Sequence, residues 1–184
     1  MLKKIFPLIA ILACIALGGC ASTATEGPGM IAHFSNIKSG QSVLIDSAVT
    51  SNGTAFANPG ALSPTRNTGY GGNGKVMTTV PDRRGLPEWV QFTWTEHAYA
   101  DKARTFEEYK TWPRETARVP VRDRVPASVI SEIIQSRKDP SKNRKEDLSL
   151  WVYFLWTDTG IKLHWRQERG CCEVLRSGGD ALSP

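Results

Sequence analysis

The chain has few of the residues from which metal centres and nucleophilic active sites are built. Its 184 residues include three histidines and four cysteines. His33, His97 and His164 lie far apart in the sequence, and none has the helical or cysteine-paired spacing of zinc ligands. A Gly-x-Ser-x-Gly elbow is also absent. We therefore expect no metal site, no cofactor and no enzyme activity.

The chain also lacks a strong excess of charge of one sign. The formal net charge is +5, and the basic residues are interleaved with acidic ones, as in Asp82-Arg83-Arg84 and Arg122-Asp123-Arg124. Proteins that bind nucleic acids usually gather lysine and arginine into a stripe or patch. We therefore expect no nucleic acid among the partners.

No apolar run is long enough to span a membrane. The longest, Ile5 to Leu17, has about 13 residues, whereas a spanning helix needs about 20. Lys3 and Lys4 precede it and small residues follow it, which is the three-part pattern of a secretory signal. We expect residues 1–19 to be a signal peptide that is removed.

The last residues of this signal carry a lipidation motif. Leu17-Gly18-Gly19-Cys20 resembles the lipobox of bacterial lipoproteins. The resemblance implies that Cys20 becomes the first residue, carries a diacylglycerol and is anchored in a membrane by acyl chains. The next residue is Ala21, not the aspartate that retains lipoproteins in the inner membrane. We therefore expect the protein at the inner leaflet of the outer membrane, facing the periplasm.

Two adjacent cysteines remain near the C-terminus. Cys14 is removed with the signal, which leaves Cys171 and Cys172. A disulfide between adjacent residues is strained, because their Cα atoms are only about 3.8 Å apart. A vicinal disulfide and a pair of buried thiols, which pack as small apolar groups, both remain open.

The rest of the sequence predicts one β-rich domain. We place a flexible tether at 20–39, the domain at 40–176 and a tail at 177–184. Alternating apolar residues predict strands over 42–50 and 85–94, a further strand over 114–122, and a hairpin of 150–156 with 161–165. Pro126 starts an amphipathic helix whose apolar stripe consists of Val129, Ile130, Ile133 and Ile134. The expected fold class is α+β, mainly β: an antiparallel sheet or sandwich with one amphipathic helix.

Several aromatic residues are candidates for partner contact. Tyr70 lies in a glycine-rich segment, TGYGGNGK, that lacks the serine or threonine and the spacing of a phosphate-binding loop. The other candidates lie in or beside the predicted strands and are Trp89, Tyr99, Tyr109 and Trp112. Tryptophan, tyrosine and arginine dominate interface hot spots, although large aromatic residues are also commonly buried in cores.

The layout resembles a family of small bacterial lipoproteins of unknown function. The matching features are Leu86-Pro87 before the strand Val90-Gln91-Phe92-Thr93-Trp94, the glycine-rich approach to it, the helix opened by Pro126, and the closing hairpin. More distantly, the chain is similar to the lipid-anchored immunity partners of phospholipase toxins delivered by type VI secretion. We therefore expect a protein-binding module that inhibits such a toxin. The alternatives are a structural or assembly lipoprotein of the envelope, and a hydrolase that uses His97 or Glu96.

Overall fold

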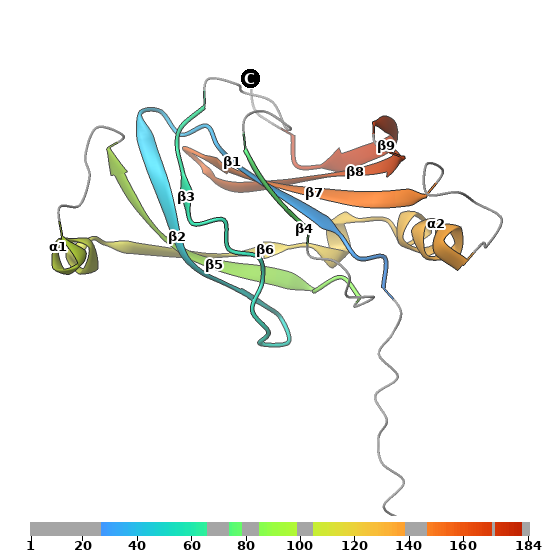
Figure 1. Cartoon of the computed structure of the whole chain (residues 1–184), viewed down its shortest axis with the longest axis horizontal. Helices are drawn as coiled ribbons and strands as arrows, with labels where there is room; N and C mark the ends of the chain where they lie inside the picture. The colour runs from blue at the N-terminus through green and yellow to red at the C-terminus, as the bar shows by residue number, and fades with distance from the viewer. Residues whose placement is uncertain are drawn as a thin grey trace, which may run out of the picture.

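The computed structural model describes residues 27–65, 74–78, 85–98, 105–138, 147–170 and 172–181, and in this part of the chain two β-sheets pack face to face (Figure 1). One sheet has the strand order β4-β1-β7-β8-β9 and the other β3-β2-β5-β6. A short helix, α1, and a longer helix, α2, lie at opposite ends of the sandwich (Figure 1). The elements are β1 (Ile31–Asn36), β2 (Gln41–Thr50), β3 (Ala61–Leu62), β4 (Lys75–Thr78), β5 (Trp89–Ala98), α1 (Phe106–Thr111), β6 (Arg114–Pro120), the 3-10 helix η1 (Arg122–Arg124), α2 (Ala127–Lys138), β7 (Leu148–Thr157), β8 (Gly160–Arg169) and β9 (Glu173–Gly179).

This architecture confirms the predicted mainly β fold class. The hairpin of β7 and β8 has the expected register, with Trp156 opposite Ile161, and Gly160 has the positive φ of 113° that its turn requires. The sheet that contains this hairpin is mixed instead of purely antiparallel, because β1 pairs with β7 in parallel.

Strand β1 corrects the predicted start of the domain. Residues 31–36 were expected in the flexible tether, but they pair with β4 on one side and β7 on the other. Ala32 and Phe34 are fully buried in the core, while the intervening His33 lies on the outer side of the sheet. Because β1 mixes polar and apolar residues and is short, its sequence lacks the apolar run by which a central strand is usually recognised.

Aromatic rings fill the space between the two sheets. Phe34 and Phe154 stack with their ring centroids 5.5 Å apart, and Phe92 from the opposite sheet meets Phe154 edge-on at 5.1 Å. Trp156 meets Phe92 at 5.2 Å in the same manner. The large buried area and the edge-to-face geometry make this cluster the main stabilising contact between the sheets.

Helix α2 closes one end of the sandwich, as its apolar stripe predicts. Val129 and Ile133 are buried, and the Ser136 hydroxyl accepts a hydrogen bond from the backbone N–H of Leu148 at 3.2 Å. The carboxylate of Glu132 accepts hydrogen bonds from Arg176 of β9 and Gln167 of β8. Those two hydrogen bonds, with Arg176 the stronger, lower the pKa of Glu132. The helix is thereby attached to the last two strands.

Strand β9 corrects the predicted end of the domain. The tail was expected from residue 177, but Ser177 and Gly178 pair with β8, and Gly179 ends the strand with φ of +114°. Beyond it, the Asp180 N–H donates to the Leu163 carbonyl at 2.7 Å, and the Asp180 carboxylate accepts from the Leu163 N–H at 2.9 Å.

Asp180 also links the end of β9 to the 3-10 helix η1, through an ion pair with Arg124. Burial opposes ionisation of this carboxyl, but the Leu163 N–H and the ion pair with Arg124 of η1 outweigh it and lower the pKa of Asp180. Because the ionised form is favoured in the folded chain, this contribution to stability is present above about pH 3.8 and is lost as the pH falls through the lowered pKa.

Replacing Gly179 with alanine is expected to lower the free energy of unfolding by about 2–4 kcal/mol. The new Cβ would lie 2.4 Å from the backbone oxygen of Leu163, and a positive φ strains alanine by about 1–3 kcal/mol. Gly160→Ala is a matched control, because Gly160 has φ of +113° and nothing within 4 Å of the new Cβ. Urea denaturation of both variants separates the clash from the strain, and equal losses would contradict the predicted clash.

Within the described part of the chain, no helix has the length and apolar character needed to cross a membrane.

Candidate functional site

The outward side chains of β5 and β6 form one surface, which we call the β5–β6 face. Val90, Phe92 and Trp94 of β5 enter the core, so the alternate positions point away from it. Antiparallel pairing sets the outward residues of the two strands opposite each other, as in Gln91 with Arg118. The face consists of Trp89, Gln91, Thr93 and His97 of β5 and Arg114, Thr116, Arg118 and Pro120 of β6, while Thr95, at an alternate position of β5, is fully buried.

One end of the β5–β6 face carries Trp89 with an arginine stacked on it. The guanidinium carbon of Arg118 lies 4.3 Å from the indole centroid, and its Nε donates to Oε1 of Gln91 at 2.9 Å. A cation held over an indole is attracted by the negative face of the ring, so the two side chains fix each other. A hollow of about 460 Å³ opens beside them, lined by Glu88, Trp89, Arg118, Pro120, Arg122 and Asp123.

The other end of the face carries Trp112 and Tyr109. Thr105 caps α1 by accepting a hydrogen bond from the N–H of Glu108 at 3.1 Å, which fixes where the helix begins. Trp112 follows the helix, and its ring lies against His97 with the centroids 4.6 Å apart. Tyr109 meets Trp112 edge-on at 5.9 Å.

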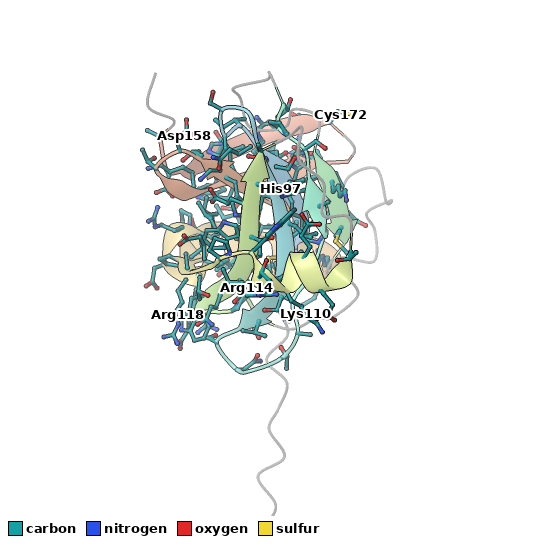
Figure 2. All side chains as sticks on the ribbon, turned by 90° about the vertical axis from the view of Figure 1, so that its left-hand side faces the viewer. His97, Lys110, Arg114, Arg118, Asp158 and Cys172 are labelled. Carbon is teal, nitrogen blue, oxygen red and sulfur yellow. The ribbon has the colours of Figure 1, made fainter. Side chains whose placement is uncertain are left out.

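Arg114 connects this aromatic group to the sheet. Its Nε lies 3.0 Å from Oδ2 of Asp46, which sits at a bulge in β2, and its guanidinium carbon lies 5.5 Å from the ring centroid of Tyr109. A second nitrogen donates to the Lys110 carbonyl at 3.2 Å. Figure 2 faces this end of the molecule and shows Arg114 and Lys110 beside α1, His97 above them, and Arg118 farther to the left.

The structure brings three predicted contact residues onto one side of the sandwich. Trp89, Tyr109 and Trp112 are all half-buried, so each leaves part of its ring accessible. Trp89 and His97 stand near the two ends of the ten-residue strand β5, which spans about 30 Å. Tyr70, Tyr99 and the predicted lipidation site Cys20 lie outside the described residues.

The cysteine prediction is partly corrected. Cys172 is exposed, which rules out the alternative in which its thiol is buried. Cys171 lies outside the described residues, so the vicinal disulfide stays a prediction.

The sequence prediction missed the arginines of the β5–β6 face. The signal was present, because Arg114, Thr116, Arg118 and Pro120 alternate with the remaining residues of their strand. What the sequence does not contain is the register that stacks Arg118 on Trp89 and places Arg114 near Tyr109.

A second group of titratable side chains lies on the outer side of the other sheet. The His33 and Tyr153 rings are 5.2 Å apart, His164 lies 6.1 Å from Tyr153, and Arg166 lies over Tyr153 at 5.0 Å. His33 was expected near the tether, but β1 places it here with 5% of its surface exposed, and Tyr153 is 4% exposed. These two rings are therefore packed parts of the fold.

The surroundings of Tyr153, His164 and Glu168 shift the pKa values of these side chains. Burial, opposed in part by Arg166, raises the pKa of Tyr153. Burial and then the charge of Arg166 lower the pKa of His164, while burial raises the pKa of Glu168 on the same strand.

Acid is expected to destabilise the protein partly through His164. Because this imidazole binds a proton less readily in the folded chain, the free energy of unfolding falls as the pH drops below about 6.5, the unfolded value. Glu168 acts in the opposite direction, because burial raises its pKa in the folded chain. His164→Gln should therefore reduce the loss of stability between pH 7.0 and 5.5, measured by urea denaturation at both values. An unchanged difference between the two pH values would contradict the assignment.

A comparison of the chain with protein-family models, with curated proteins and with solved structures finds no match. Among the described residues, no group of three or more histidine, cysteine, aspartate or glutamate side chains is arranged to hold a metal ion. The residues of the β5–β6 face, with Tyr109 and Trp112 beside it, offer indole, phenol, guanidinium and hydroxyl groups.

Proposed function

We propose that this chain is a lipid-anchored protein of the bacterial cell envelope that binds another protein through the β5–β6 face. The observation that carries the proposal is the placement of two half-buried tryptophans toward opposite ends of one strand pair, where Arg118 stacks on Trp89 and Trp112 lies against His97 and Tyr109. Half-buried tryptophan and arginine side chains supply most of the binding energy in many interfaces. The lipobox residues Leu17 to Cys20 support the placement in the envelope.

We further propose that the partner is an envelope-targeting toxin of the phospholipase type. The support is the resemblance to lipid-anchored immunity proteins and the position that an acylated Cys20 gives the domain, at the surface such a toxin attacks. Inhibition would be steric, with the β5–β6 face covering the active site of the partner. The alternative is a structural or assembly lipoprotein, in which the same face binds another component of the envelope.

Site-specific photo-cross-linking in living cells tests the proposal. A photoreactive amino acid replaces Thr116, which is exposed at the middle of the β5–β6 face, or Val174, which is 47% exposed on β9 of the other sheet. We expect one protein adduct from position 116 and none from 174. Adducts from both positions, or from 174 alone, would contradict the assigned face. Protection of cells against the cross-linked partner would distinguish immunity from a structural role.

Trp112→Ala is expected to reduce the yield of this adduct at least tenfold. Removing a central interface tryptophan commonly costs 2 kcal/mol or more of binding free energy, and the contact of Trp112 with His97 and Tyr109 would be lost with it. Trp151→Ala is the matched control, because Trp151 is half-buried on the outer side of the other sheet and stacks on Tyr153 at 6.2 Å. Equal adduct yields for the two variants would show that Trp112 does not contribute to the interface.

A further inference from the structure

The hollow beside Trp89 contains two arginines and two carboxylates that do not pair with one another. Arg118, Arg122, Glu88 and Asp123 all line it, yet among the described residues none of the four takes part in an ion pair. The neighbouring arginines behave differently, since Arg114 pairs with Asp46 and Arg124 with Asp180.

Neutral groups hold both guanidinium groups of the hollow in place. Arg118 is fixed by Oε1 of Gln91 and by the Trp89 ring. Arg122 donates from Nε and Nη2 to the Leu86 carbonyl at 3.1 and 2.6 Å. Each guanidinium has five N–H donors, so both retain donors for a charged acceptor. Their charges are positioned before any ligand arrives.

The segment that carries Arg122 and Asp123 is fixed by contacts with other parts of the chain. Arg124 is joined to Asp180, and the N–H of Val121 donates to the Glu88 carbonyl at 2.9 Å. Leu86, whose carbonyl receives Arg122, is 3% exposed. A binding site that is already ordered loses less entropy when it is filled.

We infer that this hollow receives a carboxylate side chain of the protein partner, bound by the guanidinium groups of Arg118 and Arg122. The inference rests on the proposed protein-binding function and names the chemistry of one contact in it. Guanidinium and carboxylate groups match in geometry and form short, charge-assisted hydrogen bonds. The Trp89 indole forms an apolar wall, which weakens solvent screening of the pair.

Glu88 and Asp123 restrict which anions can enter. A membrane rich in anionic lipids presents many negative charges at once, and the two carboxylates that line the hollow repel such a surface. A single acidic side chain on a partner can approach Arg118 and Arg122 while the rest of the partner provides neutral or basic neighbours. The charge pattern therefore favours a protein over a lipid headgroup.

The cross-link from Thr116 measures this contact in the full-length protein. Arg118→Gln and Arg122→Gln should each reduce the adduct at least tenfold. Arg169→Gln is the control, because Arg169 is an exposed arginine of β8 in the other sheet and pairs with Glu173 away from the hollow, and it should retain most of the adduct. An undiminished adduct in Arg118→Gln and Arg122→Gln would overturn the inference.

A second pair of variants tests the same contact through an expected increase in the yield of the cross-linked adduct. Glu88→Gln and Asp123→Asn remove negative charge from the hollow and leave both arginines in place. Each should increase the adduct severalfold at subsaturating partner, which loss of folding cannot produce. A decrease in these variants would show that the ligand is cationic and would overturn the inference.

A lipid control completes the test. The Cys20→Ser chain is floated with phosphatidylglycerol vesicles, and we expect no flotation that depends on Arg118. Flotation lost in Arg118→Gln would assign the hollow to a lipid phosphate and overturn the inference. An absent adduct from Thr116 in the otherwise unchanged protein would instead refute the proposed function and the inference together, so the two failures are distinguishable.

Discussion

Replacing Cys20 with serine is expected to release the protein almost completely from the membrane fraction. The resemblance to a lipobox predicts that the acyl chains are attached to this one residue, and each methylene buried in a bilayer contributes roughly 0.8 kcal/mol. Two or three chains therefore exceed by far the free energy of any surface contact. The measurement is fractionation of a Gram-negative host after a high-salt wash, together with labelling by radioactive palmitate.

Cys14→Ser provides the matched control for this result. Cys14 lies six residues earlier within the expected signal peptide, so its replacement should leave both the fractionation and the label unchanged. Cys20→Ser that still sediments with membranes, or unlabelled native protein, would refute the proposed anchor and with it the placement in the envelope.

Phe92→Ala is expected to lower the free energy of unfolding by about 3–5 kcal/mol, the usual range for a buried phenylalanine. The side chain is fully buried, and its ring contacts Phe34, Phe56, Phe154 and Trp156 at centroid distances of 5.1 to 6.3 Å. Phe34, Phe154 and Trp156 belong to the sheet that faces β5, so the cavity would open at the centre of the sandwich, where neither sheet can collapse to fill it.

Urea denaturation of the Cys20→Ser chain measures this loss in solution. Val174→Ala is the control, because a side chain that is 47% exposed should change stability by no more than about 0.5 kcal/mol. Phe92→Leu should cost less than Phe92→Ala, since it retains part of the apolar volume. A loss below about 1 kcal/mol for Phe92→Ala would contradict the central role given to the aromatic cluster.

The sequence predicted the elements whose own residues determine their structure. Leu150 to Trp156 is apolar on both faces, which indicates a central strand, and Gly160 marks the turn that follows it. Pro126 and the stripe of Val129 and Ile133 predict α2.

The elements that the sequence did not reveal depend on distant partners. His33 interrupts the apolar pattern of β1 and becomes buried through pairing with β7. Ser177 to Gly179 reads as a tail, because glycine has little preference for strands, and Gly179 is required by its close approach to Leu163.

The sequence identified individual residues of the candidate site, but it did not reveal that they lie together on one surface. The aromatic character of Trp89, Tyr109 and Trp112 marked them as contact candidates, and the structure assigns them to one side of the sandwich. The stacking of Arg118 on Trp89 follows from the register of β5 with β6, which sequence periodicity alone does not fix. The grouping of His33 with Tyr153 and His164 depends on a parallel strand pair that no local pattern indicates.

The parallel pairing of β1 with β7 has a consequence for how the chain matures. Ile31 lies opposite Trp151, about 120 residues later, and contacts between such distant segments form slowly. During synthesis β1 cannot acquire this neighbour until most of the polypeptide has emerged. The five-stranded sheet therefore cannot be completed until β7 has been synthesised.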